Sequence, residues 1–157
     1  MDVGVYNLHF ADALLGKAPV ALRGLASRDT DALHLQVDEQ AAYVAQFDKG
    51  ELAVMISGVR TYRPEEASVT GTSGRLTFPC FYKPSEAVLT NAAGSRTLSF
   101  PVPGGDEGYQ YEIRHVCECL KQGLTESPII PHSCSRRVLA SCDELRKTMG
   151  IVFPFDR

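Results

Sequence analysis

The sequence predicts an α+β domain in which helices pack on one face of a single, mostly antiparallel, open sheet. One helical segment opens the chain, a long series of short strand-like segments follows, and two helical segments come last. The strand-like segments follow one another through tight turns, which is the order of an antiparallel meander rather than of βαβ units. Because helices and strands are segregated along the chain, the α+β class is favoured.

The first helix is predicted over Val3–Leu15. Asp2 is expected to cap its N-terminus, and Gly16 is expected to end it in the left-handed conformation. Apolar side chains occur nearly all the way round this segment, so we expect other structure to cover more than one side of it. Gly4 within the helix costs about 1 kcal/mol relative to Ala, which is tolerable if another element packs closely against that point.

The strands are predicted from alternating apolar residues on either side of short turns. The clearest pair is Asp38–Phe47 and Leu52–Val59, which flank the turn Asp48-Lys49-Gly50 and predict a hairpin. Further strands are predicted over Val20–Ala26, Ala67–Thr70, Arg75–Phe78, Ala87–Thr90 and Thr97–Phe100. One face of such a sheet packs on the helices, while the other is solvated or pairs with a partner.

The last two helices are predicted over Tyr109–Gln122 and Ser133–Met149. Each has apolar residues at helical spacing and is followed by a glycine, Gly123 or Gly150, that can end it. We also expect a linker and an apolar tail that docks as a short strand or arm, over Pro101–Gly105 and Ile151–Phe155.

Length and composition limit the classes of protein to which this chain can belong. A chain of 157 residues fits one domain with a core of its own, so we expect a single domain over residues 1–157. The net charge of −3 without a basic run gives no indication of nucleic-acid binding. No segment approaches the about 18 consecutive apolar residues of a membrane-spanning helix. The odd count of five Cys favours a reduced, cytoplasmic protein over a disulfide framework.

Potential metal ligands occur at His115, Cys117 and Cys119, and again at His132 and Cys134. On a helix His115 and Cys119 share a face, while Cys117 points elsewhere. Zinc usually takes four convergent ligands from paired short spacings, a pattern that these residues do not form. We therefore expect ordinary buried thiols and no metal site, and nothing in the pattern marks an activated cysteine nucleophile.

No GxGxxG motif or phosphate-binding loop opens a helix after a strand. The stretch Gly71–Gly74 is a turn between two strands, with no helix after it. We therefore expect no nucleotide-binding unit in this chain and no cofactor bound by it.

Asp2 and Tyr6 are candidate catalytic residues at the start of the first helix. Four residues apart on a helix, they would share one face, where a carboxylate and a phenol can position a transferable proton. The tyrosine pKa, ordinarily about 10, could be lowered by a nearby cation. A capping aspartate followed by a core tyrosine has the same spacing, so the spacing alone leaves both interpretations open.

Several stretches resemble one enzyme family. Residues 1–11 (MDVGVYNLHFA) are similar to the segment after the nucleotide-binding domain in the glucose–fructose oxidoreductase/inositol dehydrogenase/rhizopine-catabolism (Gfo/Idh/MocA) family. Val37–Gln40 and Ser68–Arg75 resemble its sheet motifs. Tyr111–Pro128 and Asp143–Pro154 are most similar to its branch of dimeric dihydrodiol dehydrogenases and NADP-dependent D-xylose dehydrogenases. The resemblance covers nearly the whole chain, with the motifs in order.

This resemblance implies the C-terminal substrate-binding and dimerisation domain of an NAD(P)-dependent oxidoreductase acting on a sugar, polyol or diol. In the family, a lysine of the preceding Rossmann domain works with an Asp and a His or Tyr, which correspond to Asp2 and Tyr6. Tyr6 would be the acid/base at the substrate oxygen, and Asp2 would orient the substrate or the proton network. NAD or NADP would carry the hydride, and the open sheet would form a homodimer.

The sequence departs from the family in two respects. The Rossmann domain, with its Lys-Pro motif and pyrophosphate loop, is absent, and Asn7 stands where the branch often has Pro. We therefore expect an excised or truncated domain that is inactive alone. The alternative is a non-catalytic binding or assembly module that dimerises through its open sheet, and the two differ in the role of Asp2 and Tyr6.

Overall fold

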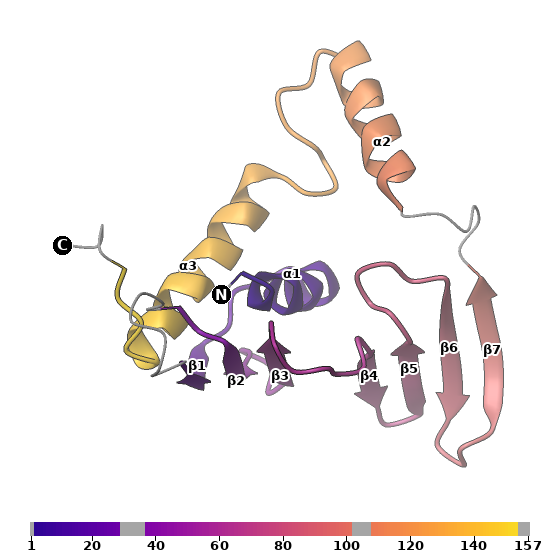
Figure 1. Ribbon diagram of the computed structural model, residues 1–157. Coiled ribbons are helices and arrows are strands. Elements are labelled where there is room, and N and C mark those ends of the chain that lie inside the picture. Colours follow the sequence, from indigo (N-terminus) through magenta and orange to yellow (C-terminus); the bar gives the residue numbers. More distant parts are fainter. Residues whose placement is uncertain (1, 29–36, 102–107, 154–157) are drawn as a thin grey trace. The chain divides into compact units, whose positions relative to one another are not determined.

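The computed structural model describes residues 2–28, 37–101 and 108–153 (Figure 1). The chain divides into two compact units, residues 1–62 with 128–157 and residues 63–127, and each is described by itself. The elements are, in chain order, α1 (Gly4–Leu15), β1 (Ala21–Ser27), β2 (Gln40–Gln46), β3 (Leu52–Gly58), β4 (Ala67–Gly71), β5 (Gly74–Phe78), β6 (Glu86–Asn91), β7 (Arg96–Pro101), α2 (Tyr109–Lys121) and α3 (His132–Thr148). The expectation of one domain over residues 1–157 stays a prediction.

The strands form two antiparallel sheets, of order β1-β2-β3 and β4-β5-β6-β7. The prediction of a single sheet is therefore wrong, while the α+β class and the antiparallel pairing are confirmed. Residues 59–66 between β3 and β4 form no strand. The hairpin of β4 and β5 that follows begins the second sheet.

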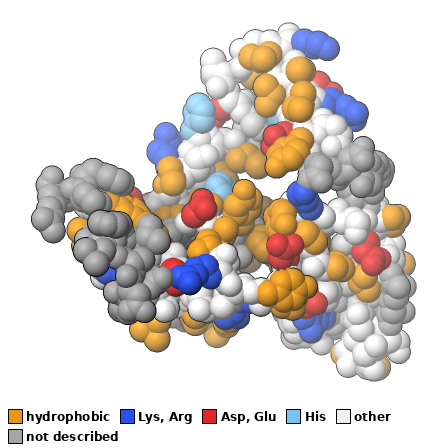
Figure 2. All heavy atoms as spheres, viewed as in Figure 1, with side chains coloured by type: hydrophobic (Ala, Val, Ile, Leu, Met, Phe, Trp, Pro, Cys, Tyr) orange, Lys and Arg blue, Asp and Glu red, His pale blue; other side chains and the backbone are white. Residues whose placement is uncertain are grey.

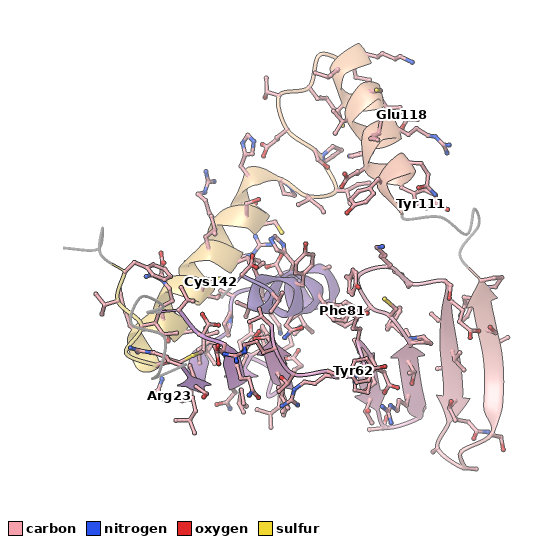
Figure 3. The ribbon with its side chains drawn as sticks, in the orientation of Figure 1. Arg23, Tyr62, Phe81, Tyr111, Glu118 and Cys142 are labelled. Atoms are coloured by element: carbon pink, nitrogen blue, oxygen red, sulfur yellow. The ribbon has the colours of Figure 1, made fainter. Side chains whose placement is uncertain are left out.

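Helices α1 and α3 cover one face of the three-stranded sheet. Side chains of β2 alternate, so that Ala41, Tyr43 and Ala45 are buried while Ala42 and Val44 are exposed. The buried residues form one apolar cluster with both helices, made of Leu8, Ala11, Leu22, Ala41, Tyr43, Ala45, Phe47, Met55, Val138, Cys142 and Leu145. Cys142 lies on the side of α3 that faces α1 (Figure 3). The prediction of helices on one face is confirmed for these two.

The opposite side of this sheet is an exposed, mainly apolar surface, which we call the outer face. It consists of Leu25, Val44, Leu52, Val54, Ile56 and Arg23, all exposed. Arg23, Val44 and Val54 are aligned across the three strands, and Arg23 points away from the helices (Figure 3). The strands therefore have one packed and one open side.

The start of α1 differs from the prediction. Val3 occupies the N-cap position without a side-chain cap, and Asp2 lies in the preceding turn, so the prediction of an Asp2 cap is wrong. At the other end Gly16 has φ 65° and donates its N–H to the Asp12 carbonyl at 2.7 Å, as predicted. Helix α1 packs against both the sheet and α3, so the expected cover on more than one side is confirmed, while Tyr6 and Leu14 remain about half exposed.

The second unit holds β4 to β7 and α2. One row of apolar side chains crosses the four strands in register, formed by Val69, Leu76, Leu89 and Leu98. Helix α2 buries only Cys119 among its residues, and hydrophobic side chains gather on its surface in the space-filling view (Figure 2).

The remaining expectations concern segments between and after the elements. Residues 102–105 of the predicted linker and residues 154–155 of the predicted tail lie outside the described residues. Ile151 is buried, but residues 151–153 form no strand. Gly123 and Gly150 end α2 and α3 with φ 68° and 65°, as predicted. None of the helices in the described part of the chain has the length and apolar character needed to cross a bilayer.

Candidate functional site

Asp2 and Tyr6 are at the N-terminal end of α1, with Asp2 in the turn before the helix and Tyr6 in its first turn. Val3 between them already has helical dihedral angles, φ −79° and ψ −20°, so the turn at Asp2 leads directly into the helix. Both residues are exposed, and Tyr6 exposes 54% of its surface. Their catalytic roles stay a prediction, but both are accessible to a substrate, which a core tyrosine would not be.

The turn that carries Tyr6 is held on the sheet by a buried tyrosine. The hydroxyl of Tyr43 on β2 donates to the carbonyl oxygen of Gly4 at 2.7 Å. The side-chain amide of Asn7 donates to the Tyr43 hydroxyl at 3.0 Å and to the carbonyl oxygen of Ile56 at 3.1 Å. Hydrogen bonds at Gly4 and Asn7, which precede and follow Tyr6 in the sequence, thus hold the first turns of α1 on β2 and β3.

Tyr43 acts in this contact as a neutral hydroxyl. Burial raises its pKa to about 12, although hydrogen bonds from Asn7 and Ser57 act in the opposite direction. A phenol with so high a pKa stays protonated at physiological pH and keeps its hydrogen bond to Gly4. A glycine inside a helix indicates close packing, so Gly4 predicted a contact at this point, but the sequence could not identify Tyr43 as the partner.

Further along α1, a buried carboxylate joins the helix to α3. Arg137 donates from Nε to Asp12 Oδ1 at 2.8 Å and from Nη2 to Asp12 Oδ2 at 2.9 Å. The Cys134 thiol donates to Asp12 Oδ2, with sulfur and oxygen 2.9 Å apart. Asp12 is 7% exposed, so its charge is buried and satisfied by three donors from α3.

These donors keep Asp12 ionised. Burial alone would raise the pKa of Asp12, but the hydrogen bonds from Arg137 and Cys134 and the charge of Arg137 outweigh it and lower the pKa. The same contact raises the pKa of the Cys134 thiol, because the carboxylate accepts its proton in a hydrogen bond. Cys134 is therefore a structural donor rather than a nucleophile.

A small pocket beside this pair has no free charge to bind a ligand. Its charged lining residues are Asp12, Arg137 and Lys17. Arg137 is paired with Asp12, while Lys17 contacts Asp48 at 2.5 Å and Glu51 at 2.7 Å. We therefore assign this pocket to packing between α1, α3 and the sheet.

The possible metal ligands come together only in part. On α2, His115 Nε2 lies 3.5 Å from Cys119 Sγ and 2.8 Å from the hydroxyl of Ser127. Cys117 is exposed, and Cys134 is engaged with Asp12 in the other unit. Within residues 2–28, 37–101 and 108–153, no group of three His, Cys, Asp or Glu side chains converges around a common point.

Sequence comparison shows relatives of this chain. The family model described as the GFO/IDH/MocA C-terminal domain matches residues 1–77. The whole chain is 31% identical to trans-1,2-dihydrobenzene-1,2-diol dehydrogenase of Bos taurus and 30% identical to that of Homo sapiens. Each alignment covers 48% of the relative. The chain thus spans about half the length of the curated relatives it matches.

Solved structures share the fold. An aldose-aldose oxidoreductase from Caulobacter crescentus, complexed with glycerol, superimposes with a TM-score of 0.76 at 20% identity, over 92% of this chain and 43% of that one. A levoglucosan dehydrogenase in complex with NADH and levoglucosan gives 0.71 at 15% identity, over 95% and 47%. At these identities the likeness concerns the fold alone.

Proposed function

Because residues 1–77 belong to the GFO/IDH/MocA C-terminal domain family, we propose that this chain is the substrate-binding and dimerisation part of an NAD(P)-dependent oxidoreductase. The observation that carries the proposal is the exposed pair Asp2 and Tyr6 at an end of α1 that Tyr43 and Asn7 fasten to the sheet. A catalytic group needs such an anchored support, because small displacements lower rates strongly.

In the proposed reaction Tyr6 is the general acid/base at the reacting oxygen of the substrate. In the oxidising direction its phenolate would take the hydroxyl proton, and in the reducing direction its hydroxyl would return it. Asp2 would orient the substrate or the proton network. NAD or NADP, held by a nucleotide-binding domain outside this chain, would accept or supply the hydride.

The substrate class follows from the relatives. Their names include a dihydrodiol, an aldose and levoglucosan, all of which carry hydroxyl groups or a carbonyl group. We therefore propose a sugar, polyol or diol as substrate. The exposed side of α1 around Tyr6 and Leu14 is where the nucleotide-binding domain would complete the pocket.

We further propose a homodimer formed through the outer face. This surface is exposed and mainly apolar, and an exposed patch of that kind often marks an interface. All five cysteines are free thiols, which supports a reducing, cytoplasmic location. A non-catalytic assembly module would use the same surface without needing Tyr6.

The test joins this chain to the nucleotide-binding part of bovine trans-1,2-dihydrobenzene-1,2-diol dehydrogenase and follows NAD(P)H with a panel of sugars and diols. We expect turnover, and we expect Tyr6→Phe to lower kcat by about 10²–10⁴-fold, the usual contribution of a positioned acid or base. Tyr62→Phe is the matched control, because Tyr62 is fully exposed at 100%. Equal activity of the two variants would overturn the assignment of Tyr6.

Calorimetry tests the chain by itself. We expect neither NAD nor NADP to bind, because the sequence has no phosphate-binding motif. Micromolar binding would contradict the proposal that a separate nucleotide-binding domain holds the cofactor. A chimera that folds and dimerises but turns over nothing in the panel would favour the assembly module.

A further inference from the structure

The side chains of His115, Cys119 and Ser127 form a small cluster at the C-terminal part of α2 and the loop after it. His115 and Cys119 are one helical turn apart, and Ser127 comes back to the same place after the loop that begins at Gly123. Cys119 is 9% exposed, and His115 and Ser127 are half-buried. Figure 3 marks Glu118, which directly precedes Cys119 in this turn.

Two donor atoms in the cluster have the separation that a tetrahedral metal ion needs. Zinc binds sulfur at about 2.3 Å and imidazole nitrogen at about 2.0–2.1 Å, which at the tetrahedral angle leaves the two atoms about 3.5 Å apart. Cys119 Sγ and His115 Nε2 are 3.5 Å apart. No rearrangement of the helix is therefore needed to bring both atoms onto one ion.

The orientation of the imidazole also fits. The same nitrogen, Nε2, faces both the Cys119 sulfur and the Ser127 hydroxyl. It can accept from both when the proton of the neutral ring is on Nδ1, so its lone pair points into the cluster. An ion there would replace the thiol proton between sulfur and nitrogen, and the Ser127 hydroxyl could accept a hydrogen bond from water on the ion.

We propose that His115 and Cys119 form an exchangeable binding site for a thiophilic divalent ion of the zinc type. A thiolate and an imidazole select such ions over magnesium or calcium, which prefer oxygen ligands. Water fills the other positions, because the described residues supply no third His, Cys, Asp or Glu ligand. The sequence pattern predicts no metal centre because four convergent ligands are missing, whereas an open site requires only this pair.

The test is a titration of the full, reduced, tag-free chain with Cd²⁺, read by the thiolate-to-metal absorption band. We expect a saturable band at one ion per chain. Outer-shell partners alone contribute about 10–100-fold to metal affinity, so loss of a direct ligand in Cys119→Ser or His115→Ala should weaken binding by at least about 100-fold. Cys117→Ser, which removes an exposed thiol two residues away, should leave binding unchanged.

A second measurement needs no variant. Zn²⁺ should protect Cys119, but not Cys117, from alkylation in the wild-type chain, as read by peptide mass spectrometry. A band that disappears in Cys117→Ser and persists in Cys119→Ser would overturn the proposal. So would unprotected Cys119 at saturating Zn²⁺, because the 3.5 Å contact would then be a hydrogen bond only.

Discussion

Arg137 on α3 binds both carboxylate oxygens of Asp12 on α1, through hydrogen bonds of 2.8 and 2.9 Å. The two residues are 125 positions apart in the chain. Their pairing fixes the first helix against the last one and, with the Tyr43 contact, holds both ends of α1. The geometry at Asp2 and Tyr6 thus depends on residues that do not themselves reach a substrate.

Arg137→Met should destabilise the unit formed by α1, α3 and the first three strands. The change leaves the Asp12 carboxylate buried, with the Cys134 thiol still donating to it, and we expect a loss of about 2–4 kcal/mol in the free energy of unfolding. Urea denaturation measures it. Arg136→Met is the control, since Arg136 is exposed and a surface change there should stay within about 0.5 kcal/mol. Equal losses in both variants would show that the Asp12 contact is not the cause.

Acid should remove the contribution of Asp12. Its folded pKa lies below the ordinary aspartate value of 3.8, so the stabilisation is present above the unfolded pKa and is lost as pH falls through the folded pKa. The stability difference between wild type and Asp12→Asn should therefore be constant near neutral pH and shrink below about pH 4. Denaturation series at several pH values measure this difference. If the difference in the free energy of unfolding grew in acid, the stabilising role of ionised Asp12 would be contradicted.

Tyr43→Phe should loosen the start of α1. The substitution removes the donor to the Gly4 carbonyl and the acceptor for Asn7, at a cost of about 1–2 kcal/mol. Hydrogen exchange of the α1 amides should speed up in the first turns. Because the folded pKa of Tyr43 is raised to about 12, its stabilising effect should be complete below about pH 10 and be lost as pH rises through 12. If the stability of Tyr43→Phe fell as steeply as that of the wild type between about pH 10 and 12, the stabilising role of the Tyr43 hydroxyl would be contradicted.

The hairpin of β4 and β5 offers a matched pair of glycines. A Cβ on Gly74 would collide with the backbone carbonyl oxygen of Thr90 on β6, which cannot move without disturbing the sheet. A Cβ on Gly71 would meet only the Gly74 oxygen, at 4.0 Å. We expect Gly74→Ala to cost about 1–3 kcal/mol and Gly71→Ala to stay within about 0.5 kcal/mol in thermal unfolding. The reverse order would mean that the strands are not paired as described.

Val54→Lys should convert the proposed dimer into a monomer. Val54 lies in the middle of the outer face and is 76% exposed in the single chain, so a lysine there costs the monomer little but places two charges in a symmetric interface. Sedimentation at micromolar concentration measures the change. Val116→Lys on α2, at 55% exposure, is the control. A wild-type chain that sediments as a monomer would refute the interface itself.

The sequence predicted local structure well and long-range pairing poorly. Alternating residues and glycine turns predicted the hairpins β2–β3, β4–β5 and β6–β7, because both act over a few residues. Nothing in the pattern of Leu52–Val59 and Ala67–Thr70 shows whether one strand pairs with the next, so the split into two sheets was missed. The Asp12–Arg137 pair was missed for the same reason, since a helix aspartate is usually solvated and its partner lies 125 residues away. His115 and Cys119 could be placed on one face because they are one helical turn apart.

The contact between the first and last helices also sets an order of events during synthesis. The unit that contains α1 is interrupted by residues 63–127, and its remaining part begins at residue 128. Ribosomes add about 5–20 residues per second, so α1 and the first sheet emerge several seconds before Arg137. Until then Asp12 lacks its counter-ion and the inner face of the sheet lacks α3. The nascent chain therefore exposes the apolar face that α3 will cover until the last helix has been made.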